Sequence, residues 1–393
     1  MNVPQKNKSA YFYFSKELRK TDEIRSIKDK KQVNTILRAK WKQVLNKTKW
    51  EMSAEEDKKR YLQEKEKWDI HKAEREVVVK SNCKIKRVEL GLCCLNNTLK
   101  ESKIKVFPNR TCVLKTALLK GKEYVQFLAL QNLNDVLTML KWNFDNGISS
   151  YRLSSNMFPH ATNEKFDGGY TLDFADDLLR EIGVKANEYG IRLSMHPGHF
   201  NHIGAKSEKV FENTLVDLRH HCDILDRIEH TIDFGNKKAI LCVHGGGTYK
   251  DKNETIKRWI ENFKRLPINI QKRLALENCE KSYSSEDCLK ICKELNIPHI
   301  FDVHHYNCFT HYNKDFIQKE PEELIPHVIE TWKKRELKPY FHISEQGVGP
   351  IGKHSEYVEN IPDYILDINE EITLDIEAKG KEKAIFYLTN KYN

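Results

Sequence analysis

Short apolar runs alternate with longer stretches of helical periodicity from about residue 87 to the end of the chain. Eight runs rich in β-branched and aromatic residues predict strands at 88–93, 150–153, 191–195, 239–243, 274–276, 299–303, 340–343 and 373–376. Apolar residues between them recur at helical spacing, for example in 173–189 and 285–295. Eight strand–helix units predict an α/β fold, a TIM (β/α)8 barrel. A doubly wound open sheet is the alternative, but no GxGxxG motif follows the first strand.

The first 80 residues have a different pattern, which predicts a small all-α unit of three helices. The first helix follows Ser9 and reaches about residue 21. The second covers about 31–47 and places Val33, Leu37 and Trp41 on one face. The third begins with the capping box Ser53-Ala54-Glu55-Glu56 and runs to about residue 76.

Charge and histidine content also separate the two parts of the chain. Residues 1–80 carry 22 Lys+Arg against 13 Asp+Glu, whereas the other 313 residues carry 44 of each. The formal net charge of +9 therefore lies entirely in the first part, and all but one of the 16 histidines lie in the second. We expect a DNA-binding domain at 1–80 and a second domain at 81–393. A solvated helical surface is the other interpretation of the basic residues.

Composition excludes several classes of protein. No stretch approaches the roughly 18 apolar residues of a membrane span, and the N-terminus lacks the apolar core of a signal peptide. The ten cysteines form no CxxC pair or regular framework, so we expect core thiols in a reducing, intracellular compartment. Secreted, membrane-spanning and collagen-like proteins are excluded.

Imidazoles and carboxylates stand at the ends of six successive predicted strands, the third to the eighth. They are His196, His244, Glu277, Asp302 with His305, His342, and Glu377. The carboxyl ends of the strands in such a barrel converge on one face. One histidine in such a place is usually structural, but burying so many polar groups without partners costs several kcal/mol. The set therefore predicts a metal centre.

The ligand types indicate which ions this centre takes. Mixed histidine and carboxylate ligands suit Mn²⁺ or Zn²⁺ better than Mg²⁺, which stays possible. We expect two or three ions, Mn²⁺ favoured, with Glu277 able to bridge two of them. A centre with several ions suits phosphodiester hydrolysis.

The second domain resembles the UV damage endonuclease family, TIM-barrel nucleases related to endonuclease IV, over about residues 87–385. The resemblance rests on LGLCCLNNTL, Asn-Arg-Thr at 109–111, YRLSSNMFP, RLSMHPG, VHGGGTY, LALEN, FDVHH and IEAKGKE. It implies ATP-independent incision immediately 5′ of UV photoproducts, which leaves a 3′-hydroxyl group.

The resemblance also implies roles for single residues. The seven strand-end residues would be metal ligands, with His354 as a further ligand and Glu277 as a catalytic residue. Lys379, in the EAKGK turn, would approach phosphate as a second catalytic residue. Asn96 and Arg110 would line the DNA groove.

The chain departs from the family pattern at four places. Asn163 stands where the family has a histidine ligand, so either His160 replaces that ligand or a metal site is weakened. His199-Phe200 stands where the family inserts Gln-Tyr at the lesion, and we expect both to contact DNA. A tyrosine of the family is replaced by Leu92, and a lysine by Tyr340.

The first domain resembles an HMG box across about residues 4–76, through SAYFYFSKELR, LRAKWKQV and SAEEDKKRYLQEKEKW. Such boxes bind the minor groove and bend the duplex by inserting apolar side chains. Phe12 stands where such boxes often carry a wedge, so we expect it to contact DNA. We expect core packing for Tyr11, Phe14, Trp41 and Tyr61.

These observations favour a metal-dependent DNA repair endonuclease with an appended DNA-binding box. The alternatives are a nuclease resembling AP endonucleases with altered lesion preference and, against the basic first domain, a metal-dependent sugar isomerase or epimerase. The expected partner is damaged double-stranded DNA, without membrane contact. We expect a monomer that works wherever DNA is kept, in a nucleus or in a viral or cytoplasmic DNA compartment.

Overall fold

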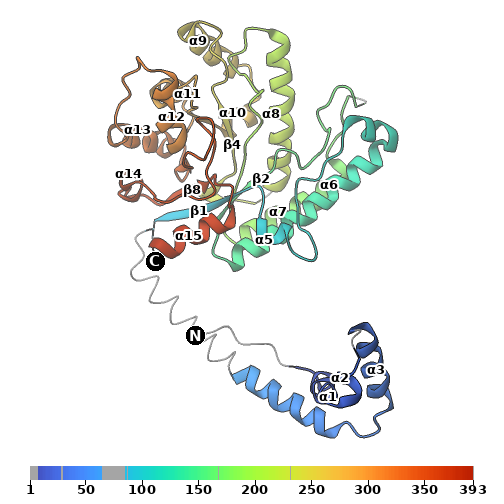
Figure 1. Ribbon diagram of the computed structural model, residues 1–393. Coiled ribbons are helices and arrows are strands. Elements are labelled where there is room, and N and C mark those ends of the chain that lie inside the picture. The colour runs from blue at the N-terminus through green and yellow to red at the C-terminus, as the bar shows by residue number, and fades with distance from the viewer. Residues whose placement is uncertain are drawn as a thin grey trace. The chain divides into compact units, whose positions relative to one another are not determined.

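A computed structural model describes residues 8–27, 30–63, 85, 87–166, 168–230 and 232–392. The chain divides into two compact units, Met1–Cys83 and Lys84–Asn393 (Figure 1). Among the described residues, no helix is long and apolar enough to cross a membrane.

The second unit is a closed barrel of eight parallel strands, ordered β1 to β8 around the ring. The strands are β1 Val88–Cys93, β2 Ser150–Leu153, β3 Arg192–Met195, β4 Ile240–His244, β5 Leu274–Glu277, β6 His299–Asp302, β7 Tyr340–Ile343 and β8 Ile372–Ile376. Pairing of β1 with β8, for example Leu92 with Ile376, closes the ring. The predicted TIM barrel is confirmed, and each predicted strand coincides with an observed one to within a residue or two.

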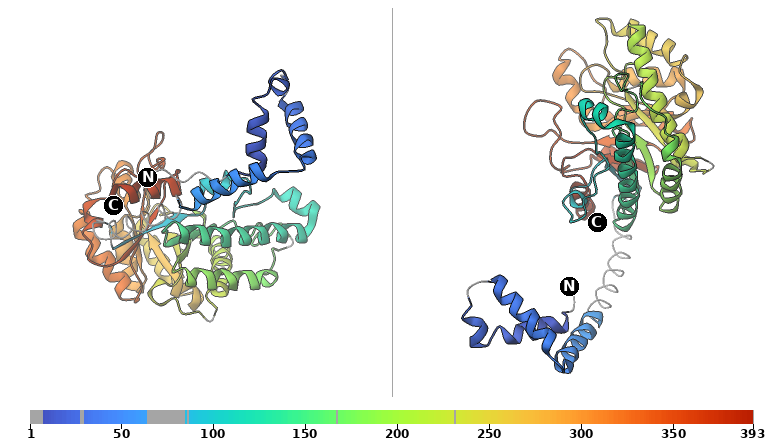
Figure 2. Two further views of the ribbon diagram at one scale, coloured as in Figure 1. Left: turned by 90° about the horizontal axis from the view of Figure 1, so that it is seen from below. Right: turned by 90° about the vertical axis from the view of Figure 1, so that its right-hand side faces the viewer.

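Helices surround this barrel (Figure 2). They are α5 Asn97–Lys100, α6 Leu114–Asp145, α7 Asp176–Glu188, α8 Glu208–Ile228, α9 Lys252–Phe263, α10 Ile268–Arg273, α11 Ser285–Leu295, α12 Val303–Tyr312, α13 Pro321–Lys333, α14 Asp363–Leu366 and α15 Glu382–Tyr392, with short 3-10 turns at Asp173–Ala175 and Gly235–Lys237.

Amphipathic periodicity explains how these helices pack on the strands. In α9, Ile256, Trp259, Ile260 and Phe263 recur at helical spacing, and all four are buried. Asp251 caps the start of this helix by accepting a hydrogen bond from the Glu254 backbone N–H. The apolar stripe is thereby turned toward the barrel wall.

The interior of the barrel contains a buried polar layer below the carboxyl ends of the strands. Asp375 accepts a hydrogen bond from Ser150, and the Tyr340 hydroxyl lies 2.9 Å from Ser194 Oγ. Gly91 makes room for Asp375, because a Cβ there would stand 1.9 Å from its Oδ1. Tyr340, one of the four departures from the family pattern, is thus a fixed interior residue. Leu92, another departure, is fully buried.

The first unit consists of α1 Ala10–Leu18, α2 Asp22–Arg25, α3 Lys30–Gln43 and a helix that covers residues 48–63 of the described chain. Ile24, Val33 and Leu37 form one buried cluster. The rings of Phe14 and Trp41 pack with their centroids 5.1 Å apart, in agreement with the core packing expected for them. Tyr11 packs edge-on against Trp41, and Tyr61 is half-buried.

The predicted start of the third helix is wrong, because the helix begins at residue 48 and not after Ser53. Ser53 lies inside it and donates a hydrogen bond to the Lys49 carbonyl. Trp50, which the periodicity did not single out, packs against Phe14 with ring centroids 5.1 Å apart. This aromatic contact lies in the first turn of the helix. The predicted part beyond residue 63 lies outside the described residues.

Candidate metal centre

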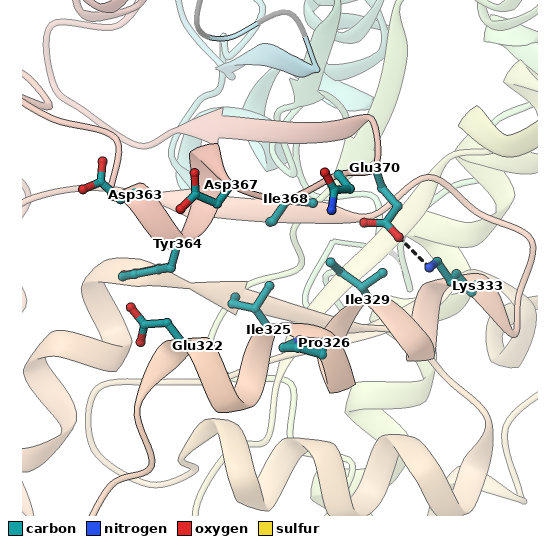
Figure 3. A pocket seen from close by; sticks show the side chains of 11 residues that line it. Glu322, Ile325, Pro326, Ile329, Lys333, Asp363, Tyr364, Asp367, Ile368 and Glu370 are labelled. Atoms are coloured by element: carbon teal, nitrogen blue, oxygen red, sulfur yellow. Dashed lines mark hydrogen bonds and ion pairs between the residues drawn. The ribbon is translucent and has the colours of Figure 1, made fainter.

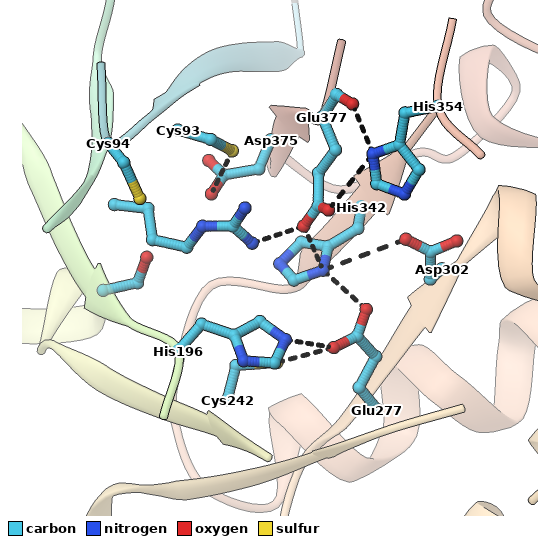
Figure 4. Close-up of polar contacts among 12 residues, drawn as sticks. Cys93, Cys94, His196, Cys242, Glu277, Asp302, His342, His354, Asp375 and Glu377 are labelled. Carbon is cyan, nitrogen blue, oxygen red and sulfur yellow. Dashed lines mark hydrogen bonds and ion pairs between the residues drawn. The ribbon is translucent and has the colours of Figure 1, made fainter. Parts of the chain in front are cut away.

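The carboxyl ends of β3 to β8 bring together the seven strand-end residues that the sequence singled out. Figure 4 shows His196, Glu277, Asp302, His342 and Glu377 directed toward one another from different strands. His244 ends β4 and His305 lies in the first turn of α12. Parallel strands that end at one level produce this convergence.

Glu277 lies at the centre of this cluster and is fully buried. Its Oε2 lies 2.8 Å from His196 Nε2 and 3.6 Å from His244 Nε2. Its Oε1 lies 2.8 Å from His342 Nδ1 and 3.5 Å from His305 Nδ1. One carboxylate therefore contacts imidazoles that come from four different segments of the chain.

Glu377 forms the other side of the cluster. Its Oε1 lies 3.2 Å from His342 Nδ1 and forms an ion pair with Arg152. His354, from the loop after β7, lies 3.8 Å from the second carboxylate oxygen of Glu377 and contacts its backbone oxygen at 2.7 Å. The structure thus places His354 beside the predicted ligands (Figure 4).

The electrostatics of the cluster favour the ionised form of two of its carboxylates, Glu277 and Glu377. Burial opposes the charge of Glu277, but His342, His244 and His196 outweigh it and hold the pKa of Glu277 well below its ordinary value. Burial likewise opposes the charge of Glu377, and Arg152 and His342 hold its pKa well below the usual range. These two carboxylates therefore offer negatively charged oxygens to cations.

Groups of donor atoms in the cluster are close enough to share an ion. The ligand atoms of His196, His244 and Glu277 lie within 4.8 Å of one another, as do those of Glu277, Asp302, His342 and Glu377. Three buried atoms there, His244 Nδ1, Asp302 Oδ2 and His342 Nε2, have no hydrogen-bond partner among the described residues. Buried polar atoms are normally satisfied. The donor set and these atoms fit divalent metal ions.

Neighbouring polar groups hold the cluster residues in place. The Asn278 side chain donates a hydrogen bond to the Asp302 carbonyl at 3.0 Å and accepts one from the Asp302 N–H at 2.9 Å. The Asn278 carbonyl lies 3.0 Å from His305 Nδ1. Asp302 Oδ1 accepts a hydrogen bond from the His305 N–H, which leaves its Oδ2 available. Such supporting contacts orient metal ligands.

The sequence analysis missed two residues of the site. Cys242 Sγ lies 3.0 Å from Glu277 Oε2, and its ligand atom groups with those of Glu277 and His342. Arg152 is the cation that pairs with Glu377. Strand alternation was the available signal for Cys242, because it precedes His244 by two residues and so points to the same side of β4.

The structure does not bring His160 into this cluster. His160 has a left-handed backbone with φ of 60°, and its Nε2 lies 2.8 Å from the Cys112 carbonyl. Its Nδ1 lies 3.2 Å from Asn163 Nδ2. His160 and Asn163, the two residues considered for the family's second-strand ligand, therefore contact each other, and His160 also contacts the Cys112 carbonyl. Of the two interpretations, this geometry favours a weakened metal site over a replacement ligand.

A cavity of about 610 Å³ opens beside the cluster. Its lining includes Asn109, Ser154, His160, His196 and Phe200. Phe200 is 65% exposed, and its ring lies against Gly198, where a Cβ would stand 2.6 Å from the ring. His199 instead stacks on His244 with ring centroids 4.7 Å apart, and burial and His196 lower its pKa.

The other candidate DNA contacts differ in their solvent exposure and in the contacts they already make. Lys379 is exposed, and Phe12 of the first unit is 39% exposed with the Lys8 ammonium 5.5 Å from its ring centre. Arg110 forms an ion pair with Asp135. Asn96 is buried, and its side chain caps α5 by accepting a hydrogen bond from the Leu99 N–H. The structure thus leaves Lys379 and Phe12 more accessible than Arg110 and Asn96.

A separate pocket of about 400 Å³ lies between α13 and α14 (Figure 3). Ile325, Ile329 and Ile368 line it, and an ion pair between Lys333 and Glu370 stands at one end. None of the strand-end residues borders this pocket.

Comparison with known proteins matches residues 88–393 to the family model described as UV-endonuclease UvdE. The UV-damage endonuclease of Schizosaccharomyces pombe is 38% identical over 312 residues, which cover 78% of this chain and 51% of that protein. A protein of Acanthamoeba polyphaga mimivirus is 37% identical over 311 residues, 78% of this chain and 91% of its own length. The crystal structure of SacUVDE matches with a TM-score of 0.68 at 29% identity, covering 77% of this chain and 97% of SacUVDE.

Two histidine variants test which imidazoles belong to the cluster. We expect His196→Ala to weaken the binding of divalent ions about tenfold or more, because His196 contacts Glu277 directly. We expect His160→Ala to leave ion binding unchanged, because both of its ring nitrogens are engaged, Nε2 by the Cys112 carbonyl and Nδ1 by the Asn163 side chain. Metal content after dialysis against Mn²⁺, measured by mass spectrometry, compares the two. Equal losses in both variants would contradict this assignment.

Proposed function

We infer the reaction from one premise: this chain belongs to the UV-endonuclease UvdE family and is a DNA repair endonuclease. We propose that it cuts the phosphodiester bond immediately 5′ of UV photoproducts, leaving a 3′-hydroxyl group. The observation that carries this proposal is the buried Glu277 carboxylate, which lies within 3.6 Å of four imidazoles.

The proposed ligands are the seven strand-end residues and His354. Divalent ions held there would stabilise the charge that develops on the phosphate oxygens and would activate water as the nucleophile. The mixture of imidazoles and carboxylates supports Mn²⁺, two or three ions per chain. Glu277 and Glu377 supply the negative charge that holds these ions.

The chain's own residues position the substrate beside this centre. The cavity next to His196 is the proposed place for damaged bases that have left the stack, and Phe200 stands at its rim as a wedge. Lys379 approaches the backbone phosphate, and Asn96 and Arg110 shape the groove. Opening a damaged base pair costs less free energy than opening an intact one, and this difference favours binding at the lesion.

The first unit is the proposed DNA tether of the enzyme. Its formal excess of positive charge supports contact with phosphates, and the exposed Phe12 ring supports insertion into the minor groove. We propose that the protein acts as a monomer on damaged double-stranded DNA, wherever DNA is kept.

One observation favours a shifted lesion preference, with incision at abasic sites as the second candidate. His199 occupies the position of the family's glutamine probe, and its ring packs on His244. Duplexes labelled at one end and carrying either a thymine dimer or an abasic site, incubated with Mn²⁺, separate the two. The duplex that is cut faster carries the preferred lesion, and the mapped cut identifies the bond that is broken.

Replacing the central carboxylate tests the proposed reaction. We expect Glu277→Gln to lower incision of a thymine-dimer duplex about a hundredfold or more, because the amide keeps the shape but removes the charge that the four imidazoles surround. Glu188→Gln, an exposed position on α7, is the matched control. The proposal fails if Glu277→Gln nicks the duplex at the wild-type rate with unchanged metal content.

Removing residues 1–80 tests the role of the first unit. We expect weaker DNA binding and a flatter dependence of binding on salt, because the whole formal excess of charge is removed. Incision at saturating DNA should persist, since every proposed metal ligand lies in the barrel. A truncated protein that is folded and loaded with metal but inactive would contradict this division.

Phe200→Ala tests the wedge. We expect incision of damaged duplex to fall about tenfold or more, because an inserted ring contributes roughly 1–3 kcal/mol of stacking. Melting temperature and metal content should stay unchanged, since the ring is mostly exposed. Phe144→Ala, a half-exposed ring stacked on Tyr189, is the control. A large loss of melting temperature with normal incision would show a packing residue instead.

A further inference from the structure

The loop that follows β7 carries an apolar tip that nothing in the proposed function yet uses. Val348, Gly349 and Pro350 are exposed, and Val348 is 95% exposed. The tip from 348 to 352 contains no charged residue. Single exposed apolar side chains are common on proteins. A functional role for this tip therefore has to be argued from the position of the loop and from the contacts that hold its shape.

Hydrogen bonds within the loop fix the shape of the tip. The Gln346 side chain donates to the carbonyls of Gly347 and Pro350 and accepts from the Gly352 N–H at 2.9 Å. The Gly347 N–H donates to the Lys353 carbonyl at 2.6 Å. The tip is therefore a closed turn built around one glutamine, which orders it before any ligand binds.

Contacts outside the turn fasten the loop to the body of the barrel. The Tyr312 hydroxyl, at the end of α12, donates to the Ile351 carbonyl at 3.0 Å. His354, two residues past the turn, lies 2.7 Å from the Glu377 carbonyl oxygen. The Ser355 N–H donates to the Glu345 carbonyl at 2.9 Å. These contacts link the turn that carries Val348 to α12 and to Glu377 of the cluster.

The order of strands puts this loop across the barrel mouth from the Phe200 loop. Phe200 follows β3 and Val348 follows β7, and three strands separate β3 from β7 in either direction around the closed barrel. The loops that carry these two exposed apolar side chains therefore follow strands on opposite sides of the barrel that holds the Glu277 cluster. Lys353 is exposed at the base of the second loop.

We propose that the tip Val348–Pro350 is a second DNA-contacting element, which inserts its apolar surface into the groove of the duplex opposite Phe200. This inference rests on the proposed function, because its ligand is the same damaged duplex. Apolar side chains that enter a base step hold a bent or opened duplex, and Lys353 offers a charge to the adjacent phosphate. Contacts on both sides of the metal centre hold the scissile bond between them.

Val348→Ser tests this element, with Val184→Ser, an exposed valine on the outer helix α7, as the matched control. Binding to a thymine-dimer duplex is measured with a chelator present, so that no cleavage occurs, and nicking is measured with Mn²⁺. 2-Aminopurine placed beside the lesion reports by fluorescence how far the duplex is opened.

We expect Val348→Ser to bind the damaged duplex about tenfold more weakly and to give a smaller fluorescence increase. Its metal content and melting temperature should match the wild type, and Val184→Ser should match it in every measurement. Wild-type binding, fluorescence and nicking by Val348→Ser would overturn the inference and leave the proposed function standing. A wild-type protein that neither binds nor nicks the damaged duplex would overturn both.

Discussion

The buried charge of Glu277 is the constraint on which the upper face of the barrel depends. An ionised carboxylate without water is costly unless partners surround it. Glu277 obtains those partners from His196, His244, His305 and His342, which lie directly after β3, at the end of β4, at the start of α12 and in β7. Segments that end at one level around a closed ring bring these four imidazoles to one side chain. The barrel topology therefore makes the site possible.

Around Glu277 the cluster contains more carboxylates than permanent cations, which explains why it suits metal cations. Three carboxylates, Glu277, Asp302 and Glu377, face one permanent cation, Arg152, which pairs with Glu377. The imidazoles offset part of this excess, and divalent ions would offset the rest. Below the cluster, Asp375 is accommodated because Gly91 leaves space for it and Ser150 donates a hydrogen bond to it. The polar interior thus supports the metal centre from beneath.

Most of the barrel and the centre of the site could be predicted from the sequence, because both depend on regular rules. Apolar runs of four to six residues mark buried parallel strands. The carboxyl ends of these strands converge on one face of the barrel regardless of the details of the intervening helices. Other features depend on contacts that periodicity does not contain. In the helix that starts at residue 48, Trp50 of the first turn packs on Phe14, which lies in another helix. The orientation of His160 follows from its left-handed backbone and the Cys112 carbonyl.

Anomalous X-ray diffraction from crystals of the full chain soaked in Mn²⁺, collected at the manganese absorption edge, tests the central claim most directly. The account predicts two or three anomalous peaks among His196, His244, Glu277, Asp302, His305, His342, His354 and Glu377, with Glu277 touching more than one. Strong peaks elsewhere in the molecule with none at Glu277 would contradict it.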